Sequence, residues 1–475
     1  IIGASLEQLR ADMSRLKDVD PELARDFAKA QQQLTAPIHQ EDWSPALFDK
    51  TSSWAHRDFE ERQKFDEILS RIQQTPGFEN FLRPLSEAKI FEAASRGPVV
   101  VISVAPFGCD ALLVTANGVR AVPLPDLSHS EVVSKAQNGD FGSYDTLEWL
   151  WMTVARPVLD ALGFTQRYQD SGNGSNSMPP HIWWIPTGPL TNFPLHAAGL
   201  HRARTGQTVL DRVMSSYASS ITSLIHVRER WFLLPPAPSD STSGIDGISN
   251  QVLLVAMEET PGVARHAVLP FAAKEVEVVR QLCTFMGLSP ISPGGHKQTI
   301  ARYLRSCQFF HFAGHGATDP VNAENSRLLL LPDNDAPANN LDDGTPTNDG
   351  SLRVSEILDM DLTSNPTHPP PFLAYLSACG TGSMRDVRVA DESIHLANAF
   401  QLAGFRHVLG TFWEVLDKMC VDVTRFVYER LLRDWKRGDL TDDSVCRALH
   451  EALTTRYDIC AVTPNLVDFL AGRGE

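Results

Sequence analysis

Short, continuously apolar segments alternate with longer amphipathic segments in the second half of this 475-residue chain, and this alternation constrains the fold most strongly. We expect strands over residues 252–257, 309–313, 372–377 and 407–412, and helices over residues 272–286 and 391–403. Strands that are apolar at every position are typical of a parallel sheet whose two faces are both covered by helices. The sequence therefore predicts an α/β domain over residues 246–475.

A similar alternation precedes this domain. The expected elements are strands 98–104, 110–115, 119–122 and 181–186, and a helix over 143–162. Two stretches rich in Gly, Ser, Pro and Asp, 170–180 and 234–250, are typical of a mobile loop and an interdomain linker. The pattern predicts a second α/β domain over residues 86–245.

Residues 1–85 have a helical pattern. Asp20 followed by Pro21 is typical of a helix N-cap and first turn, and an apolar stripe recurs through 65–72. The first residues contain neither Met nor a signal peptide, so we interpret Ile1 as an internal cut through a longer protein. Two or three amphipathic helices bury little apolar surface by themselves, so we interpret residues 1–85 as the end of an upstream helical array.

Composition excludes several classes of protein. Hydrophobic residues are 43% and charged residues 21% of the chain, which excludes a mostly disordered protein. The net charge of −16 argues against broad binding to nucleic acid or to an anionic membrane. No apolar run reaches the ~18 residues of a membrane-spanning helix. Seven scattered cysteines without a Cys-x-x-Cys pair indicate free thiols in a reducing compartment, and we expect a soluble, cytoplasmic protein.

Two of the expected strands end in residues that can perform chemistry. His315 follows the strand at 309–313 after Gly314, and Cys379 follows the strand at 372–377 after Ala378. Catalytic groups in open α/β sheets lie at the carboxyl ends of the strands. If the two strands are neighbours, His315 and Cys379 meet although 64 residues separate them (379 minus 315). A Cys–His pair is the minimum for thiolate catalysis.

The surrounding residues satisfy the needs of such a pair. An imidazole can accept the proton of a thiol whose ordinary pKa is ~8.5, and backbone N–H groups beside glycines can hold a developing oxyanion. The N–H groups of Gly316 and Cys379 are the oxyanion candidates. The alternative is that Cys379 is a buried small hydrophobe and His315 a turn residue bonded to backbone.

At this point the chain resembles a known family, the CHAT domains. The resemblance is carried by the motifs at 311–316, 376–382, 391–392 and 402–413, and upstream by those at 184–190, 193–199 and 215–217. It extends from about residue 86 to residue 458. CHAT domains are caspase-like cysteine peptidases, related to separase and commonly attached to tetratricopeptide (TPR) repeats.

This resemblance implies a caspase-like parallel-sheet sandwich and a cysteine endopeptidase. His315 would be the general base and Cys379 the nucleophile. Residues 86–245 would be a pseudo-protease half without a His–Cys pair, 246–475 the protease half, and 1–85 the end of a TPR-like array that senses a partner. Loops at 317–350 and 380–391 would order on activation. Family members act in immune and cell-death signalling, where a gasdermin-like pore-forming protein is a plausible substrate, and no cofactor is implied.

The S1 pocket, which binds the side chain before the cut, is suggested by residues 413–417. They resemble a separase segment in which an acid binds a basic side chain, so Asp417, with Glu414, is the candidate for selecting Arg or Lys. The alternative is that Asp417 caps a helix over 418–434. Metacaspases carry an acid two residues before the nucleophile, whereas this chain has Ser377 there, which weakens any transfer of their specificity or calcium dependence.

Two other functions are compatible with some of the same residues. Cys379 and Arg385 fit the Cys-x5-Arg pattern of phosphatases, although Ala378 replaces the usual preceding His. An inactive interaction module with a protease-like fold is the alternative from another class. Zinc is not expected, because His311 and His315 would lie ~13 Å apart along a strand. No phosphate-binding Gly-x4-Gly-Lys-Ser/Thr loop is present, and no nucleic-acid partner is expected.

Overall fold

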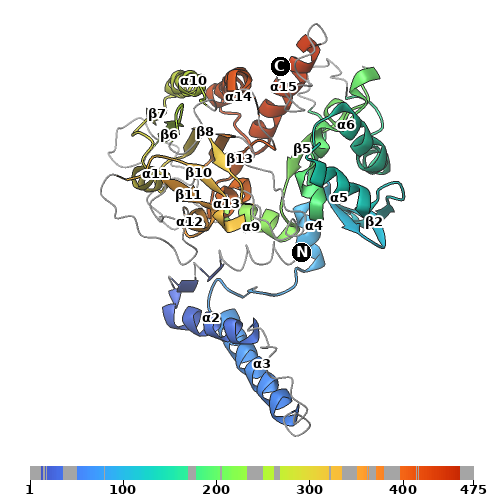
Figure 1. Cartoon of the computed structure of the whole chain (residues 1–475), viewed down its shortest axis with the longest axis vertical. Coiled ribbons are helices and arrows are strands. Elements are labelled where there is room, and N and C mark those ends of the chain that lie inside the picture. Colours follow the sequence, from blue (N-terminus) through green and yellow to red (C-terminus); the bar gives the residue numbers. More distant parts are fainter. Residues whose placement is uncertain are drawn as a thin grey trace. The chain divides into compact units, whose positions relative to one another are not determined.

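The computed structural model describes residues 12–13, 16–17, 19–35, 51–79, 81–168, 178–203, 206–232, 250–260, 268–319, 323–333, 350–360, 362, 371–378, 396–412, 415 and 417–460. The chain divides into two compact units. Ser5–Ser86 form the smaller unit, and Glu87–Glu475 with Ile1–Ala4 form the larger one. Figure 1 shows the elements coloured along the sequence.

The smaller unit contains α2 (Pro21–Thr35) and α3 (Thr51–Gln74). The expected helix start is confirmed, because α2 begins at Pro21 and Asp20 Oδ1 accepts a hydrogen bond from the Leu23 N–H at 2.9 Å. The two helices bury a small aromatic core. Its buried members are Leu16, Leu23, Ala24, Phe27, Ile72, Phe78 and Phe81.

The first sheet of the larger unit has the order β3-β2-β1-β4-β5. Its strands are β1 (Val99–Ala105), β2 (Gly108–Thr115), β3 (Gly118–Pro123), β4 (His181–Pro186) and β5 (Met214–Tyr217). The sheet is mixed: β1, β2 and β3 pair antiparallel, whereas β1, β4 and β5 pair parallel. On β2, Cys109, Ala111 and Leu113 are buried on one face of the sheet, whereas on the other face Asp110 and Leu112 are exposed and Val114 is buried.

Helices cover both faces of the first sheet. The helices are α4 (Glu87–Ala93), α5 (His129–Asn138), α6 (Tyr144–Leu150), the π-helical turn η3 (Trp151–Ala155), α7 (Arg156–Ala161), α8 (Val209–Arg212) and α9 (Ile221–Phe232), with the 3-10 turns η4 (Gly188–Asn192), η5 (Leu195–Ala197) and η6 (His201–Ala203). One face packs against α5, α6 and α7 around the fully buried Trp151 and Trp184. The other face packs against α4 and α9 around Val99 and Ile185.

The second sheet has the order β13-β12-β8-β6-β7 and is entirely parallel. Its strands are β6 (Gln251–Ala256), β7 (Ser289–Ile291), β8 (Phe309–Gly314), β12 (Leu373–Ala378) and β13 (His407–Leu409). The predicted α/β class with apolar parallel strands is therefore confirmed. The edge strand β7 was not predicted, since three residues are too few to show a pattern.

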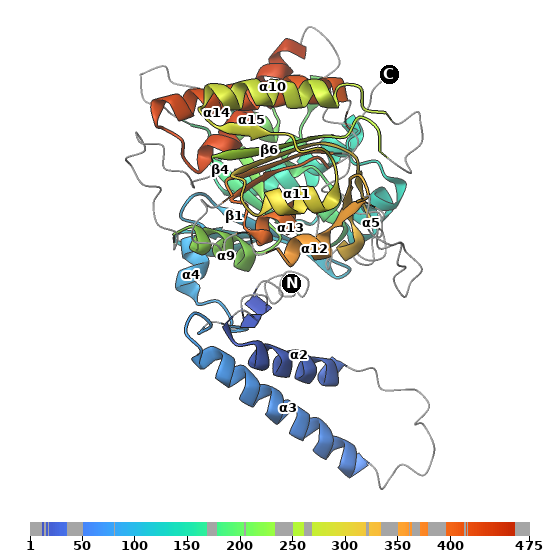
Figure 2. The same ribbon diagram turned by 90° about the vertical axis from the view of Figure 1, so that its left-hand side faces the viewer.

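The helices of the second sheet lie on both of its faces (Figure 2). They are α10 (Ala272–Phe285), α11 (Lys297–Leu304), α12 (Val354–Leu358), α13 (Leu396–Ala403), α14 (Asp417–Arg437) and α15 (Asp443–Cys460). α10 and α14 cover one face, and α11, α12 and α13 cover the other. A small antiparallel sheet, β9 (Gly316–Ala317), β10 (Arg327–Leu329) and β11 (Ser351–Arg353), follows β8.

α15 joins the two sheets within the larger unit. Ala448 belongs to the core of the second sheet, whereas Leu453 belongs to the core of the first. Near the start of α15, Asp443 Oδ1 lies 3.4 Å from Nδ1 of His181, which is on β4. Asp442, just before α15, pairs with Arg96 and Arg406, which precede β1 and β13. Apolar contacts and ion pairs together hold this junction.

Titration of buried histidines at this junction predicts how the free energy of unfolding depends on pH. Burial lowers the pKa of His196 and His407 from 6.5 to about 4. Between these pH values the unfolded chain binds more protons than the folded one, so the free energy of unfolding decreases as the pH falls below 6.5. Burial opposes the charge on His181, but Cys446 and Asp443 outweigh it and raise its pKa to about 9. The stabilisation of the folded chain by protonated His181 is complete below pH 6.5 and is lost as the pH rises toward 9.

We therefore expect these three histidines to give a maximum in the unfolding free energy near pH 6.5. Each histidine changes it by at most about 1.4 kcal/mol per pH unit outside the maximum. Urea titrations between pH 4 and pH 9 measure this dependence. His181→Gln is expected to flatten the alkaline side, and an unchanged alkaline side in that variant would contradict the assignment.

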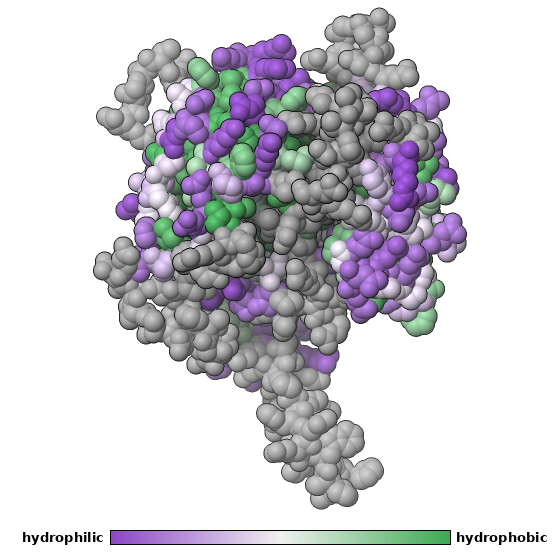
Figure 3. Space-filling model, turned by 45° about the horizontal axis from the view of Figure 1, so that its top comes forward, coloured by the Kyte–Doolittle hydropathy of each residue, from purple (hydrophilic) through white to green (hydrophobic). Residues whose placement is uncertain are grey.

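No helix within the described residues is both long enough and apolar enough to span a bilayer. On the face drawn in Figure 3, hydrophilic and hydrophobic residues are interspersed over the described surface. The predicted free thiols are confirmed at the five cysteines that the structure describes fully. These are Cys109, Cys283, Cys307, Cys420 and Cys446.

Candidate active site

The strands that precede His315 and Cys379 are neighbours at the centre of the second sheet. β8 and β12 pair in parallel through six register positions, the last of which places Gly314 beside Ala378. Every residue of both strands is buried. His315 follows Gly314 and is partly buried, whereas Cys379, the next residue after Ala378 in the sequence, lies outside the described residues. The two strands thus end at the same edge of the sheet.

A glycine is required where β8 ends. A Cβ atom on Gly314 would lie 2.7 Å from Phe312 Cζ and 2.9 Å from Met257 Cβ, both closer than side chains tolerate. The Met257 N–H donates a hydrogen bond at 2.8 Å to the carbonyl of Ala313. The absence of a side chain at Gly314 therefore allows the chain after β6 to pack directly against the residue before His315.

The chain after His315 is fixed by the small sheet. The His315 carbonyl accepts a hydrogen bond from the Leu329 N–H at 3.0 Å, and Gly316 pairs with Leu328 as the first residue of β9. The backbone on both sides of His315 is thus held by strands. The oxyanion role of the Gly316 and Cys379 N–H groups stays a prediction.

A side chain from beyond β13 anchors the end of β12. Thr411 Oγ1 donates a hydrogen bond at 2.5 Å to the carbonyl of Ala378. Thr411 lies six residues before Asp417 in the sequence, so this bond connects the backbone just before Cys379 to the chain that leads into the predicted S1 segment. Sequence reasoning placed this segment in the site but did not predict the contact.

Asp417 begins α14 and connects it to the start of α10. Its Oδ2 accepts a hydrogen bond from the Phe271 N–H at 3.0 Å, and its Oδ1 accepts one from the Lys418 N–H at 2.8 Å. These contacts agree with the helix-terminal alternative, because a carboxylate at a helix N-terminus is stabilised by free N–H groups. Selection of a basic side chain by Asp417 stays a prediction, and Glu414 lies outside the described residues.

A buried carboxylate behind β8 and β12 was not predicted. Glu275 is 1% exposed, and it lies on the face of α10 that contacts the sheet, together with Val276 and Val279. A glutamate within the apolar stripe of an amphipathic helix was the signal that could have identified it. Its partners include Ser377 on β12 and His311 on β8.

Within the described residues, no cluster of three or more His, Cys, Asp or Glu side chains could hold a metal ion. At the carboxyl end of β4, the Thr187 hydroxyl donates to the Ile102 carbonyl at 2.9 Å, a structural contact between strands. Arg385 of the phosphatase pattern lies outside the described residues.

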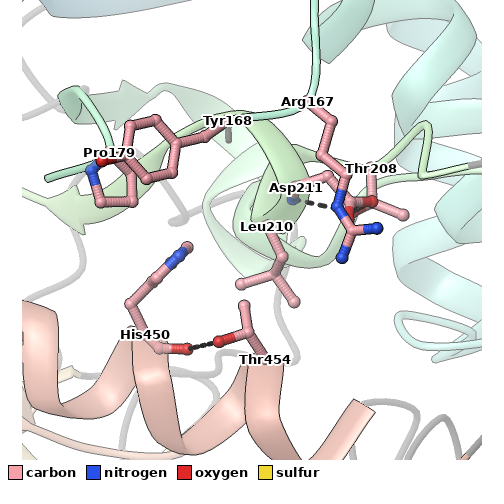
Figure 4. Close-up of a pocket in the computed structure, with 8 residues that line it drawn as sticks. All are labelled: Arg167, Tyr168, Pro179, Thr208, Leu210, Asp211, His450 and Thr454. Atoms are coloured by element: carbon pink, nitrogen blue, oxygen red, sulfur yellow. Dashed lines mark hydrogen bonds and ion pairs between the residues drawn. The ribbon is translucent and has the colours of Figure 1, made fainter. Parts of the chain in front are cut away.

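A cavity of about 210 Å³ opens between the first sheet's half and α15 (Figure 4). Arg167 forms an ion pair at 3.3 Å with Asp211 on one side of it, and His450 of α15 lies on the other. Burial lowers the pKa of His450 from 6.5 to about 4, so this side chain is neutral at pH 7. None of the predicted site residues lines this cavity.

Comparisons with known proteins identify the family to which this chain belongs. No curated protein matches the chain. Among solved structures, one similar to it is the crystal structure of the Arg-specific cysteine proteinase gingipain R, with a TM-score of 0.39 and 12% sequence identity. That alignment covers 71% of this chain and 73% of gingipain R. The family model of the CHAT domain matches residues 144–461, more than half of the chain. The chain therefore belongs to the CHAT domain family, as its motifs at the ends of β8 and β12 indicated.

Proposed function

We propose that this chain is a cysteine endopeptidase in which His315 and Cys379 form the catalytic dyad. The observation that carries this proposal is the pairing of Gly314 with Ala378 at the ends of β8 and β12. Neighbouring strands lie ~4.8 Å apart, so the residues that follow these two start from adjacent backbone positions. A nucleophile and its base must be within hydrogen-bond reach, and this pairing supports such proximity.

In the proposed mechanism, His315 accepts the thiol proton of Cys379 as the sulfur attacks the scissile carbonyl carbon. The N–H groups of Gly316 and Cys379 stabilise the oxyanion that forms. Collapse of this intermediate breaks the C–N bond, and His315 gives its proton to the leaving amine. Water then attacks the thioester, His315 accepts a proton from it, and the release of the carboxyl product regenerates the thiol of Cys379.

The proposal extends to specificity and regulation. Asp417, with Glu414, would accept a basic side chain before the cut, and the hydrogen bond from Thr411, six residues before Asp417, to the carbonyl of Ala378 supports this proposal. Residues 86–245 would serve as a pseudo-protease scaffold, and the helices at 1–85 would receive a signal from TPR-like repeats or a sensor partner. The substrate would be a protein of cytoplasmic cell-death or immune signalling, with a gasdermin-like protein as one candidate.

The test compares the chain with its Cys379→Ala variant on a peptide library, with cut sites identified by mass spectrometry. We expect cleavage after Arg or Lys by the unmodified chain and none by the variant. Asp417→Asn is expected to reduce the preference for Arg and Lys while cleavage continues. Absence of cleavage by both forms, even with the upstream helical region and candidate partners added, would favour the inactive interaction module.

A further inference from the structure

The carboxylate of Glu275 connects four elements of the fold. Thr424 Oγ1 on α14 donates to Glu275 Oε1 at 2.7 Å, and Ser377 Oγ on β12 donates to Oε2 at 3.1 Å. His311 Nε2 on β8 lies 3.2 Å from Oε1, although the two atoms are not aligned as a hydrogen bond. Burial of a carboxylate is costly unless its oxygens are bonded, and these groups provide that compensation.

This network lies behind the catalytic edge on one face of the sheet. His311 precedes His315 by four residues on β8, and Ser377 precedes Cys379 by two residues on β12. Alternate residues of a strand share a face, and residues with odd numbers on both strands pack toward α10 and α14. The ring of Tyr428 on α14 packs against the ring of His311, with 5.7 Å between the ring centroids.

Small residues occupy the last positions of both strands. Ser377 pairs with Ala313, and Ala378 pairs with Gly314. The small side chains of these residues bury little apolar surface against the helices. Few large side chains therefore stabilise the sheet just before the catalytic residues. Among the described residues, the hydrogen bond from Ser377 Oγ to Glu275 is the last one that a side chain of β12 itself forms before Cys379, and the carbonyl of Ala378 then accepts from Thr411.

The same helices also hold the predicted S1 residue. Glu275 lies in the first turn of α10 and bonds to Thr424 of α14, while Asp417 at the start of α14 bonds to the N–H of Phe271 just before α10. Asp417 thus joins the starts of the two helices, Thr424 joins α14 to Glu275 about two turns further along, and Glu275 connects both helices to β12. A change at Glu275 would act on the nucleophile strand and on the specificity segment together.

We propose that Glu275 is a positioning residue, whose carboxylate, acting through Ser377 and His311, fixes the spacing between Cys379 and His315. This inference rests on the proposed peptidase function. Glu275 itself does not contact substrate in this proposal. Displacement of reacting groups by about 1 Å can cost a factor of about 100 in rate, so a connection of this kind is expected to affect kcat more than KM.

The test uses Glu275→Gln, Ser377→Ala and the double variant in the full chain. We expect each single variant to lower kcat by about 10- to 100-fold with KM changed less than about threefold. The double variant is expected to lose no more than the stronger single variant, because both changes remove one connection. Glu277→Gln is the matched control, since Glu277 lies on the same helix, is 55% exposed and pairs with Arg280.

A second measurement separates this inference from the proposed function. The rate of Cys379 alkylation by iodoacetamide, read by mass spectrometry with Cys446 as internal reference, requires no substrate. We expect it to fall in Glu275→Gln and Ser377→Ala but not in Glu277→Gln. Ser377→Ala with an unchanged melting temperature, kcat and alkylation rate would overturn the positioning role. If the unmodified chain cleaves nothing, the peptidase proposal fails, while the alkylation rates still decide the role of Glu275.

Discussion

Replacement of His315 by glutamine is expected to lower kcat/KM by about 10⁴-fold, as much as removal of the nucleophile. Without an imidazole, no group of the dyad accepts the thiol proton during attack or returns it to the leaving amine. Members of a catalytic unit give losses that do not add, so Cys379→Ala combined with His315→Gln is expected to be no less active than Cys379→Ala alone. Single-turnover assays on a peptide identified by the library measure these rates.

A matched histidine variant separates loss of the base from a general effect on folding. His129→Gln is the matched control, because His129 begins α5 in the other half of the larger unit. Full activity in His315→Gln would exclude the dyad, whereas loss of activity in both variants would indicate a general effect on folding.

The largest effect on stability is expected from Phe310→Ala, which should lower the unfolding free energy by about 3–5 kcal/mol. Phe310 is fully buried on β8, and its ring stacks at 5.4 Å on Phe400 of α13. Its backbone pairs with Leu253 on β6 and Ala374 on β12, so the cavity would open at the centre of the sheet. Such a loss is a large fraction of the 5–15 kcal/mol that is typical of folded proteins.

Urea denaturation measures this change through the midpoint and slope of the transition. Phe107→Ala is the control, since Phe107 is 102% exposed at the turn between β1 and β2 and its removal should change the free energy by less than about 0.5 kcal/mol. Equal stability of the two variants would contradict the central place of β8 in the core.

The parallel strands were predictable because burial on both faces leaves an apolar residue at every position. The predicted strands at 309–313 and 372–377 differ from β8 and β12 by one residue at their ends. The short strands β7, β9, β10 and β11 were missed, because two or three residues show neither alternation nor a continuous apolar run. Long-range pairing rather than local sequence determines these elements.

One predicted helix illustrates a different limit. The expected helix over 143–162 is divided into α6, the π-helical turn η3 and α7. The apolar pattern is continuous through all three, since Leu147, Trp151 and Val158 belong to the same core. A π-helical turn changes backbone hydrogen bonds by one residue without interrupting burial, so a pattern of side chains does not reveal it.

The candidate site was partly predictable for similar reasons. His315 stands out because a small-residue turn follows an apolar strand, and strand pairing then brings its strand beside the one that precedes Cys379. Glu275 reaches the site from a helix 102 residues before Ser377, and no local pattern connects the two. Contacts made by tertiary packing, such as the bond from Thr411 to Ala378, require the folded chain.

The position of α15 has a consequence for biosynthesis. His181 and Asp443, which meet at the junction of the two sheets, are 262 residues apart. A ribosome that adds about 5–20 residues per second needs on the order of 10 to 50 seconds to synthesise that interval. Throughout it, the edge strand β5 lacks the contacts that α15 makes with it in the folded chain, such as those of Cys446 with Ser215 and Ser216, and exposed edges attract other strands. Chaperones that cover exposed strands would therefore matter most for this protein before α15 leaves the ribosome.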